Sequence, residues 1–536
     1  MVDVDLAAHK RRSEKAWNQR SPWNAIYQEA YDYAVPMRRP GNTNGARVKT
    51  PDRLFDMTAP MSAMYFAGNL QRDLFPSGQP TFTLETGPIA AAAIGPQGVK
   101  VYDRELEKVA KTIHPFFLAG DWDTAVHEMC VDLAVGTGAI IPIKGTVRNP
   151  VTFACIPFDQ LAISVDAFGR VRLVSWKQMI EHEQLLEAFP DADWPEGFKE
   201  AAKKKPSDEV ELFQDFYADP AGAGWHFVAY VNKCVKPIKH ERTRTQPVAV
   251  PRYYRIPGEA YGRGVILTAL PSIKTLNKAQ ELALKSAAIN MLGIWGYRAG
   301  GTFNPDTVRM GPGEFWPMQA TGGVLGPDVQ RLDPASARFD VAKMLIGDLQ
   351  DQIKQAMFDT RLPDYQGTPR AASEIAARLR QKADVHIGAF GRLVNEIMPV
   401  IVPRVAEILS ELGMLPGTPL QIDELLVSIK VRSPMAAALN ADRLASIANY
   451  WEMVSAIAGP QNAGLYADVE KILERVADGL QIDKELVPDE ERKKVLMAEM
   501  ERQQQAQILQ LFGAKAAEHA PKVIGDLAAG GLKQAA

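Results

Sequence analysis

The sequence predicts a mainly α-helical protein with β-rich inserts, an α+β fold class, and three observations support this assignment. Apolar residues recur at helical spacing over most of the chain. Residues from about 140 to 256 instead form short apolar runs separated by turn residues, which is the pattern of antiparallel strands. No region alternates regularly between strands and helices, so a parallel nucleotide-binding sheet is not expected.

Length and charge restrict the class of protein. The chain has 536 residues, of which 46% are hydrophobic and 23% charged. It is too long for one core, so we expect several structural units of roughly 100–200 residues each. The net charge is −3, from 61 basic and 64 acidic residues. Tight DNA binding usually requires a basic excess, because phosphate neutralisation supplies much of the affinity. The chain therefore either has no DNA role or handles DNA without holding it tightly.

Neither a disulfide framework nor a membrane anchor is expected. Cys130, Cys155 and Cys234 have no paired spacing, which argues against disulfides and a zinc site. The N-terminal residues lack the apolar segment of a secretory signal. No run of about 18 apolar residues is present, so no membrane partner is expected.

Four helices are expected before the β-rich part. They are predicted over 12–34, from Thr58 to just before Pro76, over about 97–119 and over about 122–135. Thr58 is the expected N-cap of the second helix, and Gly136 follows the fourth. Between the first two helices, the polar stretch 38–50 predicts an exposed loop. One face of the second helix carries four residues of note: Met61, Met64, Tyr65 and Gly68.

The β-rich part contains two hairpin signals and a further strand signal. The first hairpin is predicted from strands at 163–166 and 171–173 around Gly169. The second is predicted from strands at 210–217 and 225–231, with a turn rich in glycine between them. A further strand is predicted over 248–255.

Two helices of similar length bracket a compact insert. The first is predicted over 271–291, beginning at Pro271, and the second over 338–358. Residues 292–333 between them are rich in glycine, proline and aromatic residues, so we expect the insert at the end of an antiparallel helical pair. The first helix has a narrow stripe that suits close helix packing, made of Ile273, Leu276, Ala279, Ala283 and Ala287. The second has a stripe made of Phe339, Ala342, Leu345, Leu349, Ile353 and Met357.

The C-terminal part is expected to be largely helical. Residues 359–370 predict a loop, and residues 371–412 predict a long helix. Two glycines and two prolines should kink this helix. A strand over 425–432 and helices over 436–480 follow, the latter with a stripe of Leu444, Ile447, Trp451 and Val454. A charged and then Gln-rich tail is expected to be helical from Asp489 to about Ala517.

Motifs for catalysis are missing. The segment nearest to a phosphate-binding loop, 138–145, lacks both the glycine before the lysine and the hydroxyl that would bind Mg²⁺. His127 and Glu128 begin like a zinc-protease helix, but Val131 occupies the position of the second histidine. No nucleophile elbow is present. We therefore expect no enzyme activity, no catalytic or metal-binding residues and no cofactor.

Several segments, taken in order, resemble the head-to-tail connector, or portal, family of short-tailed double-stranded DNA bacteriophages (podovirus type). The similarity begins in 52–60, continues in 67–76 and includes the strand signal at 81–84. It extends to 131–138, 165–169 and 258–264, and to the order helix, insert, helix, loop and long kinked helix. The resemblance covers about residues 15–475, and the order of the segments makes it specific.

The resemblance implies a ring, usually of twelve subunits, at one capsid vertex and at the head–tail junction of the virion. Double-stranded DNA would be packaged and ejected through its channel. The implied partners are a terminase motor, a tail adaptor and major capsid or scaffold proteins, with assembly in the host cytoplasm. The implied regions are a wing at 1–270, stem helices at 271–291 and 338–358, a clip at 292–337, a tunnel loop at 359–370, a wing helix and strand at 371–435, a crown at 436–484, and a C-terminal helical tail or barrel at 485–536.

Three features of the residues agree with this family. The small-residue stripe of the first stem helix suits packing against neighbouring subunits. The near-neutral charge suits a conduit, because strong phosphate binding would oppose sliding. The absence of a motor motif suits a passive channel served by a separate ATPase. A tail or internal scaffold protein without a DNA-wide channel is the main alternative.

The site candidates each have a functional and a structural interpretation. Arg361 and Arg370 in the tunnel loop could contact the DNA backbone, or could be solvated or paired between subunits. Lysines of the first stem helix could face the channel, or could form an exposed face balanced by Glu281; they are Lys274, Lys278 and Lys285. Clip aromatics could bind partners or form the clip's own contacts; they are Trp295, Tyr297, Phe303, Phe315 and Trp316. Three further basic residues of the second stem helix have no assigned role: Arg338, Lys343 and Lys354.

Overall fold

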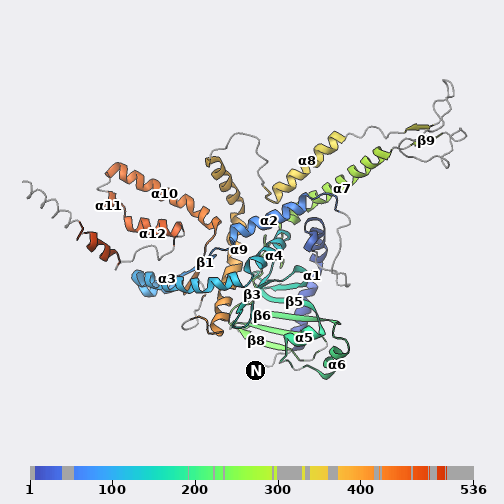
Figure 1. The fold of residues 1–536 in the computed structure, drawn as a ribbon, viewed down its shortest axis with the longest axis horizontal. Coiled ribbons are helices and arrows are strands. Elements are labelled where there is room, and N and C mark those ends of the chain that lie inside the picture. Colours follow the sequence, from blue (N-terminus) through green and yellow to red (C-terminus); the bar gives the residue numbers. More distant parts are fainter. Residues whose placement is uncertain are drawn as a thin grey trace, which may run out of the picture. The chain divides into compact units, whose positions relative to one another are not determined.

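The computed structural model confirms a mixed α/β protein that is mostly helical (Figure 1). It describes residues 6–38, 54–190, 192, 194–220, 222, 224–232, 234, 236–292, 295–297, 329–331, 339–359, 372–415, 422, 425–459, 463–480, 482, 492–500 and 502–503. These residues fall into two compact units, Met1–Ala438 and Leu439–Ala536.

The helices of the first unit follow the apolar periodicity of the sequence. Their bounds are α1 Leu6–Ala34, α2 Thr58–Leu74, α3 Pro88–Ala119, α4 Trp122–Val135, α5 His182–Ala188, α6 Glu196–Lys204, α7 Val265–Leu292, α8 Phe339–Ala356 and α9 Ala372–Glu411, with a 3-10 turn η1 at Pro36–Arg38 and another, η2, at Phe158–Gln160. The predictions for α2, α4 and α9 are confirmed within a residue or two, although Met57 rather than Thr58 is the N-cap of α2. The described part of α9 keeps Pro399 and Pro403 inside one helix.

Helices α1 and α3 begin earlier than predicted, and the short helices α5 and α6 were not predicted. Helix α1 begins at Leu6 rather than at 12, and α3 begins at Pro88 rather than at about 97. Gly95, with a φ of 77°, is not helical and separates a short helical segment that begins at Pro88 from the helix predicted over about 97–119, which is confirmed. The short helices α5 and α6 lie within the part predicted to be β-rich, where they cover their own small apolar cluster around Trp194 and Phe198.

The β-rich part forms a five-stranded antiparallel sheet in the order β4-β5-β6-β7-β8. Both predicted hairpins are confirmed, with Gly169 at φ 76° in the first turn and Gly222 at φ 76° in the second. The strand bounds are β1 Phe82–Thr86, β2 Ile140–Lys144, β3 Val151–Cys155, β4 Leu161–Val165, β5 Val171–Glu181, β6 Glu209–Ala218, β7 Trp225–Val231, β8 Lys239–Thr243, β9 Trp295–Tyr297, β10 Val329–Arg331 and β11 Val427–Val431.

The strand predicted over 248–255 is wrong. This segment makes only isolated bridges, such as that between Ala249 and Ile140. Pro251 lies in its middle and has no N–H to donate, so a continuous ladder cannot form there. The segment instead runs through the core in an extended form, with Tyr253 almost fully buried.

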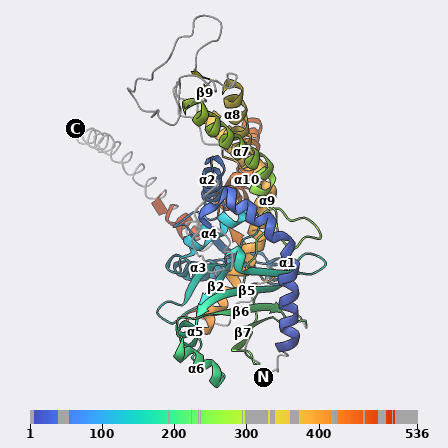
Figure 2. The same cartoon turned by 90° about the vertical axis from the view of Figure 1, so that its right-hand side faces the viewer.

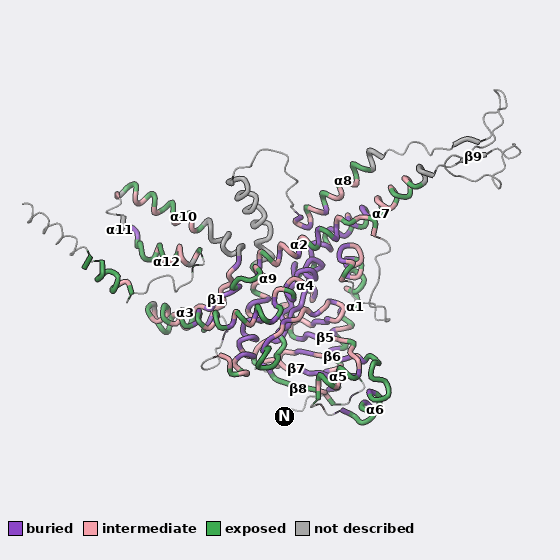
Figure 3. Tube along the Cα trace, in the orientation of Figure 1, coloured by how far each residue is buried: buried purple, intermediate pink, exposed green. Residues whose placement is uncertain are grey.

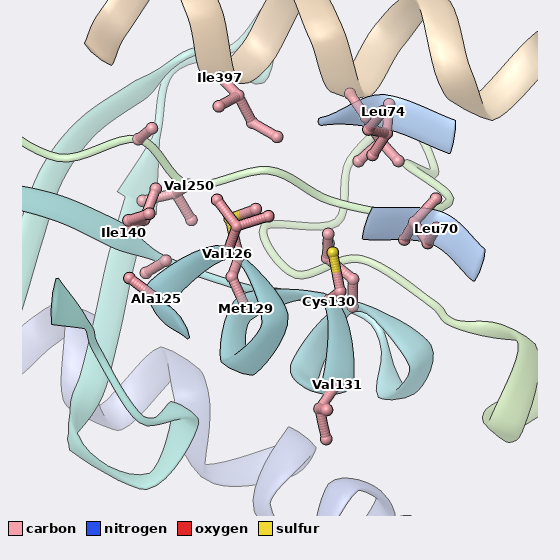
Figure 4. Close-up of a cluster of buried hydrophobic side chains, with 14 of the residues drawn as sticks. Leu70, Leu74, Ala125, Val126, Met129, Cys130, Val131, Ile140, Val250 and Ile397 are labelled. Carbon is pink, nitrogen blue, oxygen red and sulfur yellow. The ribbon is translucent and has the colours of Figure 1, made fainter. Parts of the chain in front are cut away.

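Helix α4 lies at the centre of the main core. It packs between α2, the β2 strand, the segment around Val250 and α9 (Figure 4). Most of its residues are buried, and Figure 3 shows the purple of buried residues concentrated around it. Val126, Met129 and Cys130 are completely shielded from solvent. The apolar residues that follow, such as Leu133 and Ile140, belong to the same buried core. None of the described helices has an apolar stretch long enough to cross a membrane.

A close backbone approach joins the end of α4 to the segment that precedes α7. A Cβ at Gly136 or Gly262 would meet the carbonyl oxygen of the other residue, and a Cβ at Gly264 would meet that of Ala134. The hydroxyl of Tyr27 in α1 donates to the carbonyl of Gly262. The Gly262 N–H in turn donates to the Thr137 hydroxyl at 2.8 Å. Two segments that carry the family resemblance, 131–138 and 258–264, thus form one structural unit with α1.

A buried carboxylate fastens the end of α1 to α4. Asp132 is 1% exposed and accepts a hydrogen bond from the Tyr31 hydroxyl at 2.8 Å. Arg38 of η1 places its Nε 2.9 Å from the same carboxylate. Arg38 Nη2 also donates to the sulfur of Cys155 at 3.1 Å. This network fixes the end of the N-terminal helix where the sequence enters the polar stretch 38–50.

This carboxylate should give the protein a distinctive pH dependence. Burial raises the pKa of Asp132 to about 6, although Arg38 and Tyr31 oppose that rise. The unfolded chain would release this proton at a pKa of about 4, so the native chain holds more protons between about pH 4 and 6. The stability contributed by Asp132 is therefore complete below this window and is lost as pH rises through it.

Comparison with Asp132→Asn isolates this contribution, because asparagine cannot titrate. We expect the wild-type advantage in free energy of unfolding to be larger at pH 4.5 than at pH 7.5, by on the order of 2 kcal/mol. Denaturant unfolding of both proteins at the two pH values measures it. An advantage that grows with pH would contradict the raised pKa.

The described residues of the second unit are mainly helical. Helix α10 (Pro434–Ala458) enters it and is followed by α11 (Ala463–Tyr466), α12 (Val469–Gly479) and a helical segment over 492–500. The Leu444 side chain lies where a Cβ on Gly479 would be, so α10 and α12 approach closely. The predicted helices over 436–480 are confirmed. The predicted stripe Leu444, Ile447, Trp451 and Val454 is the half-buried side of α10.

Candidate assembly and DNA-channel surfaces

The predicted helical pair is present as α7 and α8, which lie side by side in both views (Figures 1 and 2). Helix α7 begins at Val265, six residues before the predicted start, and Pro271 lies inside it. Val265 and Ile266 are buried in the core, so packing favours an earlier start than the proline signal indicates. Pro271 remains on the exposed side, at the cost of one backbone hydrogen bond in the helix.

The small-residue stripe of α7 is its more buried side. Ile273 and Leu276 are buried, and the three alanines of the stripe are half-buried. On α8, Ile353 and Met357 are buried, while Ile346 and Leu349 pack against the core cluster. The buried residues of both stripes therefore pack within their own chain, whereas the sequence suggested packing against neighbouring subunits for the stripe of the first helix.

The predicted stripe of α8 is partly wrong. Leu345 is 54% exposed, and Ile346 takes its place on the packed side. Because Leu345 and Ile346 are adjacent and both apolar, the sequence does not show which of them lies on the packed side of α8. The position of α7 decides in favour of Ile346. The side chains of Phe339 and Ala342 lie outside the described residues.

Polar side chains tie the bases of both helices to the segment before α2. Asn277 of α7 accepts the N–H groups of Phe55 and Asp56 at 2.7 and 3.3 Å. Gln350 of α8 donates to the Asp56 carboxylate at 2.9 Å. The sequence did not reveal these contacts, although Asp56 lies in the first segment that carries the family resemblance. These bonds attach the α7–α8 pair to the segment before α2. They also place residues 277 and 350 at similar levels along the two helices.

The other end of the pair carries two short strands. Trp295–Tyr297 and Val329–Arg331 pair as an antiparallel ladder, β9 with β10, beyond the end of α7 (Figure 1). Trp295 and Tyr297 are thus in β9, but the surroundings of their side chains are not described. The other predicted clip aromatics, Phe303, Phe315 and Trp316, lie outside the described residues. So do Arg338 and the two loop arginines, Arg361 and Arg370.

The three candidate lysines of α7 all pair with carboxylates of their own chain. Lys278 and Lys285 lie 2.9 and 2.5 Å from Glu281, and their hydrogen bonds lower the pKa of that carboxyl to about 2. Lys274 lies 3.0 Å from Glu29 of α1. In the isolated chain, these lysines therefore fit the structural interpretation, in which they form an exposed face balanced by Glu281.

The remaining basic candidates of α8 lie on its exposed sides. Lys343 is exposed, and Lys354 lies 3.3 Å from Asp351 one turn away. Pairs of this kind contribute little in an isolated chain, because water screens both charges.

The segment that begins like a zinc-protease helix lies in the middle of α4 and contacts α2. His127 lies 3.0 Å from the Gln71 side chain of α2. Within the described residues, no group of three or more histidine, cysteine, aspartate or glutamate side chains is arranged to hold a metal ion. Burial raises the pKa of Cys130 well above its usual value, as for a small core residue.

Comparisons with known proteins agree with the fold. The family model described as "Bacteriophage head to tail connecting protein" matches residues 6–487. The chain is 21% identical over 506 residues to the portal protein of Escherichia phage T7, covering 91% of this chain and 90% of that protein. It is 20% identical to the portal protein of Enterobacteria phage T3, with the same coverage. The match spans nearly all of the elements described above, and the chain belongs to the family of bacteriophage head-to-tail connecting proteins.

Proposed function

We propose that this chain is a portal subunit, which forms a ring-shaped channel at one capsid vertex for the packaging and later ejection of double-stranded DNA. The observation that carries the proposal is the α7–α8 pair, closed at its outer end by the β9–β10 ladder. This pair lies inside a family match that covers residues 6–487. Two portal proteins match over 91% of the chain, which disfavours a tail or scaffold role.

In this proposal, α7 and α8 are the stem, and residues 292–337 are the clip that docks the terminase motor and then the tail adaptor. The wing would comprise 1–270 and 371–435, the crown 436–484, and the tail or barrel 485–536. The wing would contact major capsid or scaffold proteins in the virion, after assembly in the host cytoplasm. We propose a passive structural channel without a cofactor, in keeping with the connecting role that the family model describes.

The charge of the chain supports passage of DNA without tight binding. The net charge is −3, and the α7 lysines are already balanced by carboxylates. Each phosphate that a protein neutralises adds affinity, so a channel with few unpaired cations lets DNA slide. The loop arginines, Arg361 and Arg370, remain our proposed transient contacts with the DNA backbone. Packaging and DNA retention that stay normal after both are changed to alanine would exclude that role.

Purified protein tests the proposal directly. We expect native mass measurement to show a closed ring, of usually twelve copies, and axial electron-microscope images to show a central hole about as wide as duplex DNA. A protein that stays monomeric at virion-like ionic strength, or closes without a hole, would contradict the portal role and favour the scaffold or tail alternative.

A further inference from the structure

Two arginines meet where the extended segment after Val250 runs beside α9 (Figure 4). Arg252 donates its backbone N–H and a guanidinium N–H to Glu396 of α9, at 2.9 and 3.1 Å. Arg392 of the same helix donates to the carbonyl of Tyr253. Residues four positions apart lie on one face of a helix, so Arg392 and Glu396 border the same stretch of the segment.

A third guanidinium group lies nearby. Arg255 donates to the carbonyl of Phe168 in the β4–β5 turn. Burial lowers the pKa of Arg252, and the positive charges of Arg255 and Arg392 lower it further. Glu396 opposes that change. Arg252, Arg255 and Arg392 therefore influence one another and form what we call the arginine cluster.

The other carboxylates of these segments have their own basic partners. Asp166 in the β4–β5 turn lies 3.6 Å from Arg172. Glu259 lies 2.6 Å from Arg263. Glu396 is thus the carboxylate that offsets the arginine cluster, and the cluster keeps an excess of positive charge.

The buried donors of the cluster are incompletely bonded. Arg252 is 3% exposed, and its Nε and Nη1 atoms have no hydrogen-bond partner among the described residues. The buried Nε of Arg392 has none there either. A charged donor that is buried without an acceptor is costly, so an ordered water or an ion usually bonds to such a group. Guanidinium groups only donate, and an excess of positive charge favours an anionic acceptor over water.

We propose that Arg252 and Arg392 bind a small oxyanion, with Arg255 adding positive potential. A tetrahedral oxyanion such as phosphate presents several acceptor oxygens, and a guanidinium fork can bind two of them side by side. The near-complete burial of Arg252 favours a free anion over a phosphate in the backbone of duplex DNA. The bound anion links α9 to the segment that precedes α7. This site depends neither on the ring nor on the passage of DNA.

Phosphate titration of the full-length protein tests the site. Ionic strength is held constant with chloride, and binding is followed by calorimetry and by the thermal unfolding midpoint. With a Kd near about 1 mM, about 20 mM phosphate should raise Tm by roughly 2–4 °C. Sulfate should have a similar effect and compete with phosphate, because it has the same tetrahedral shape. Chloride alone should not raise Tm in this saturable way.

Substitutions at Arg392 test which side chain binds, because this residue is only half-buried. We expect Arg392→Gln to weaken phosphate binding at least tenfold. Arg392→Lys should lose less affinity, because lysine keeps the charge but not the planar fork. Arg72→Gln removes the same charge from a residue of α2 that is 62% exposed, and should leave phosphate binding unchanged.

Glu396→Gln gives a change of opposite sign. It removes the negative charge that competes with the anion, so folded Glu396→Gln protein should bind phosphate several-fold more tightly than wild type. Circular dichroism checks that each variant keeps its native helix content. If Glu396→Gln does not fold, the comparison of Arg392→Gln with Arg72→Gln decides the question.

Three results would overturn the site. The first is wild-type protein that shows no saturable phosphate binding, which would assign water to the free N–H groups. The second is equal phosphate affinity in wild type and Arg392→Gln. The third is a short DNA duplex that binds through Arg392 while inorganic phosphate does not, which would make the residue a DNA contact. Ring formation is measured separately, so none of these results bears on the portal proposal.

Discussion

Replacing Gly264 by alanine should lower the free energy of unfolding by about 3 kcal/mol or more, the largest loss we expect from adding one methyl group. The new Cβ would meet the carbonyl oxygen of Ala134 and lie 2.5 Å from the carbonyl carbon of Val135. Both atoms belong to the backbone of α4, a helix most of whose residues are buried. A flexible side chain could move aside, but this backbone cannot do so without repacking the core.

Gly68→Ala provides the matched control. Gly68 lies within α2, and a Cβ there would have no atom within 4 Å. Alanine is the better helix former, so this variant should gain about 0.5–1 kcal/mol. Denaturant unfolding of both variants measures the contrast. Equal stability of Gly264→Ala and wild type would mean that α4 and the segment before α7 do not approach as closely as described.

Helices were the most predictable part of the fold, because their apolar spacing is a local property. The bounds of α2, α4 and α9 follow from it, whereas the start of α7 does not. There, buried Val265 and Ile266 extend the helix through Pro271, against the local signal. The segment over 248–255 shows the opposite failure. Its composition favours a strand, but a proline and the available neighbours leave only isolated bridges.

For the α7–α8 pair, the sequence predicted the two helices and most of their packed residues, with Leu345 as the exception. The stripe and the lysines of α7 were separated correctly, since both follow from helical period. The ties through Asn277, Asp56 and Gln350 could not be predicted, because more than 200 positions separate some of these residues and only folding brings them together. The attachment of α7 and α8 to the segment before α2 depends on those ties, so it becomes visible only in three dimensions.

Glu396→Ala should destabilise the protein by about 3–5 kcal/mol, because it leaves a buried arginine without its partner. Glu396 of α9 accepts the backbone N–H of Arg252 at 2.9 Å and a guanidinium N–H at 3.1 Å. The Arg252 side chain is 3% exposed, and its Nε and Nη1 atoms have no hydrogen-bond partner among the described residues. Burial lowers the pKa of Arg252, and Glu396 opposes that change by stabilising the charged form.

Another glutamate of the same helix provides the control. Glu411 pairs with Lys144 at 2.6 Å, but both side chains are more than 40% exposed. Glu411→Ala should therefore cost less than about 1 kcal/mol, because water replaces the lost partner. Changing Arg252 to methionine together with Glu396→Leu should recover most of the stability that Glu396→Ala loses, since no uncompensated charge remains buried. Similar losses for Glu396→Ala and Glu411→Ala, measured by denaturant unfolding, would show that the Arg252 pair does not hold α9 to the core.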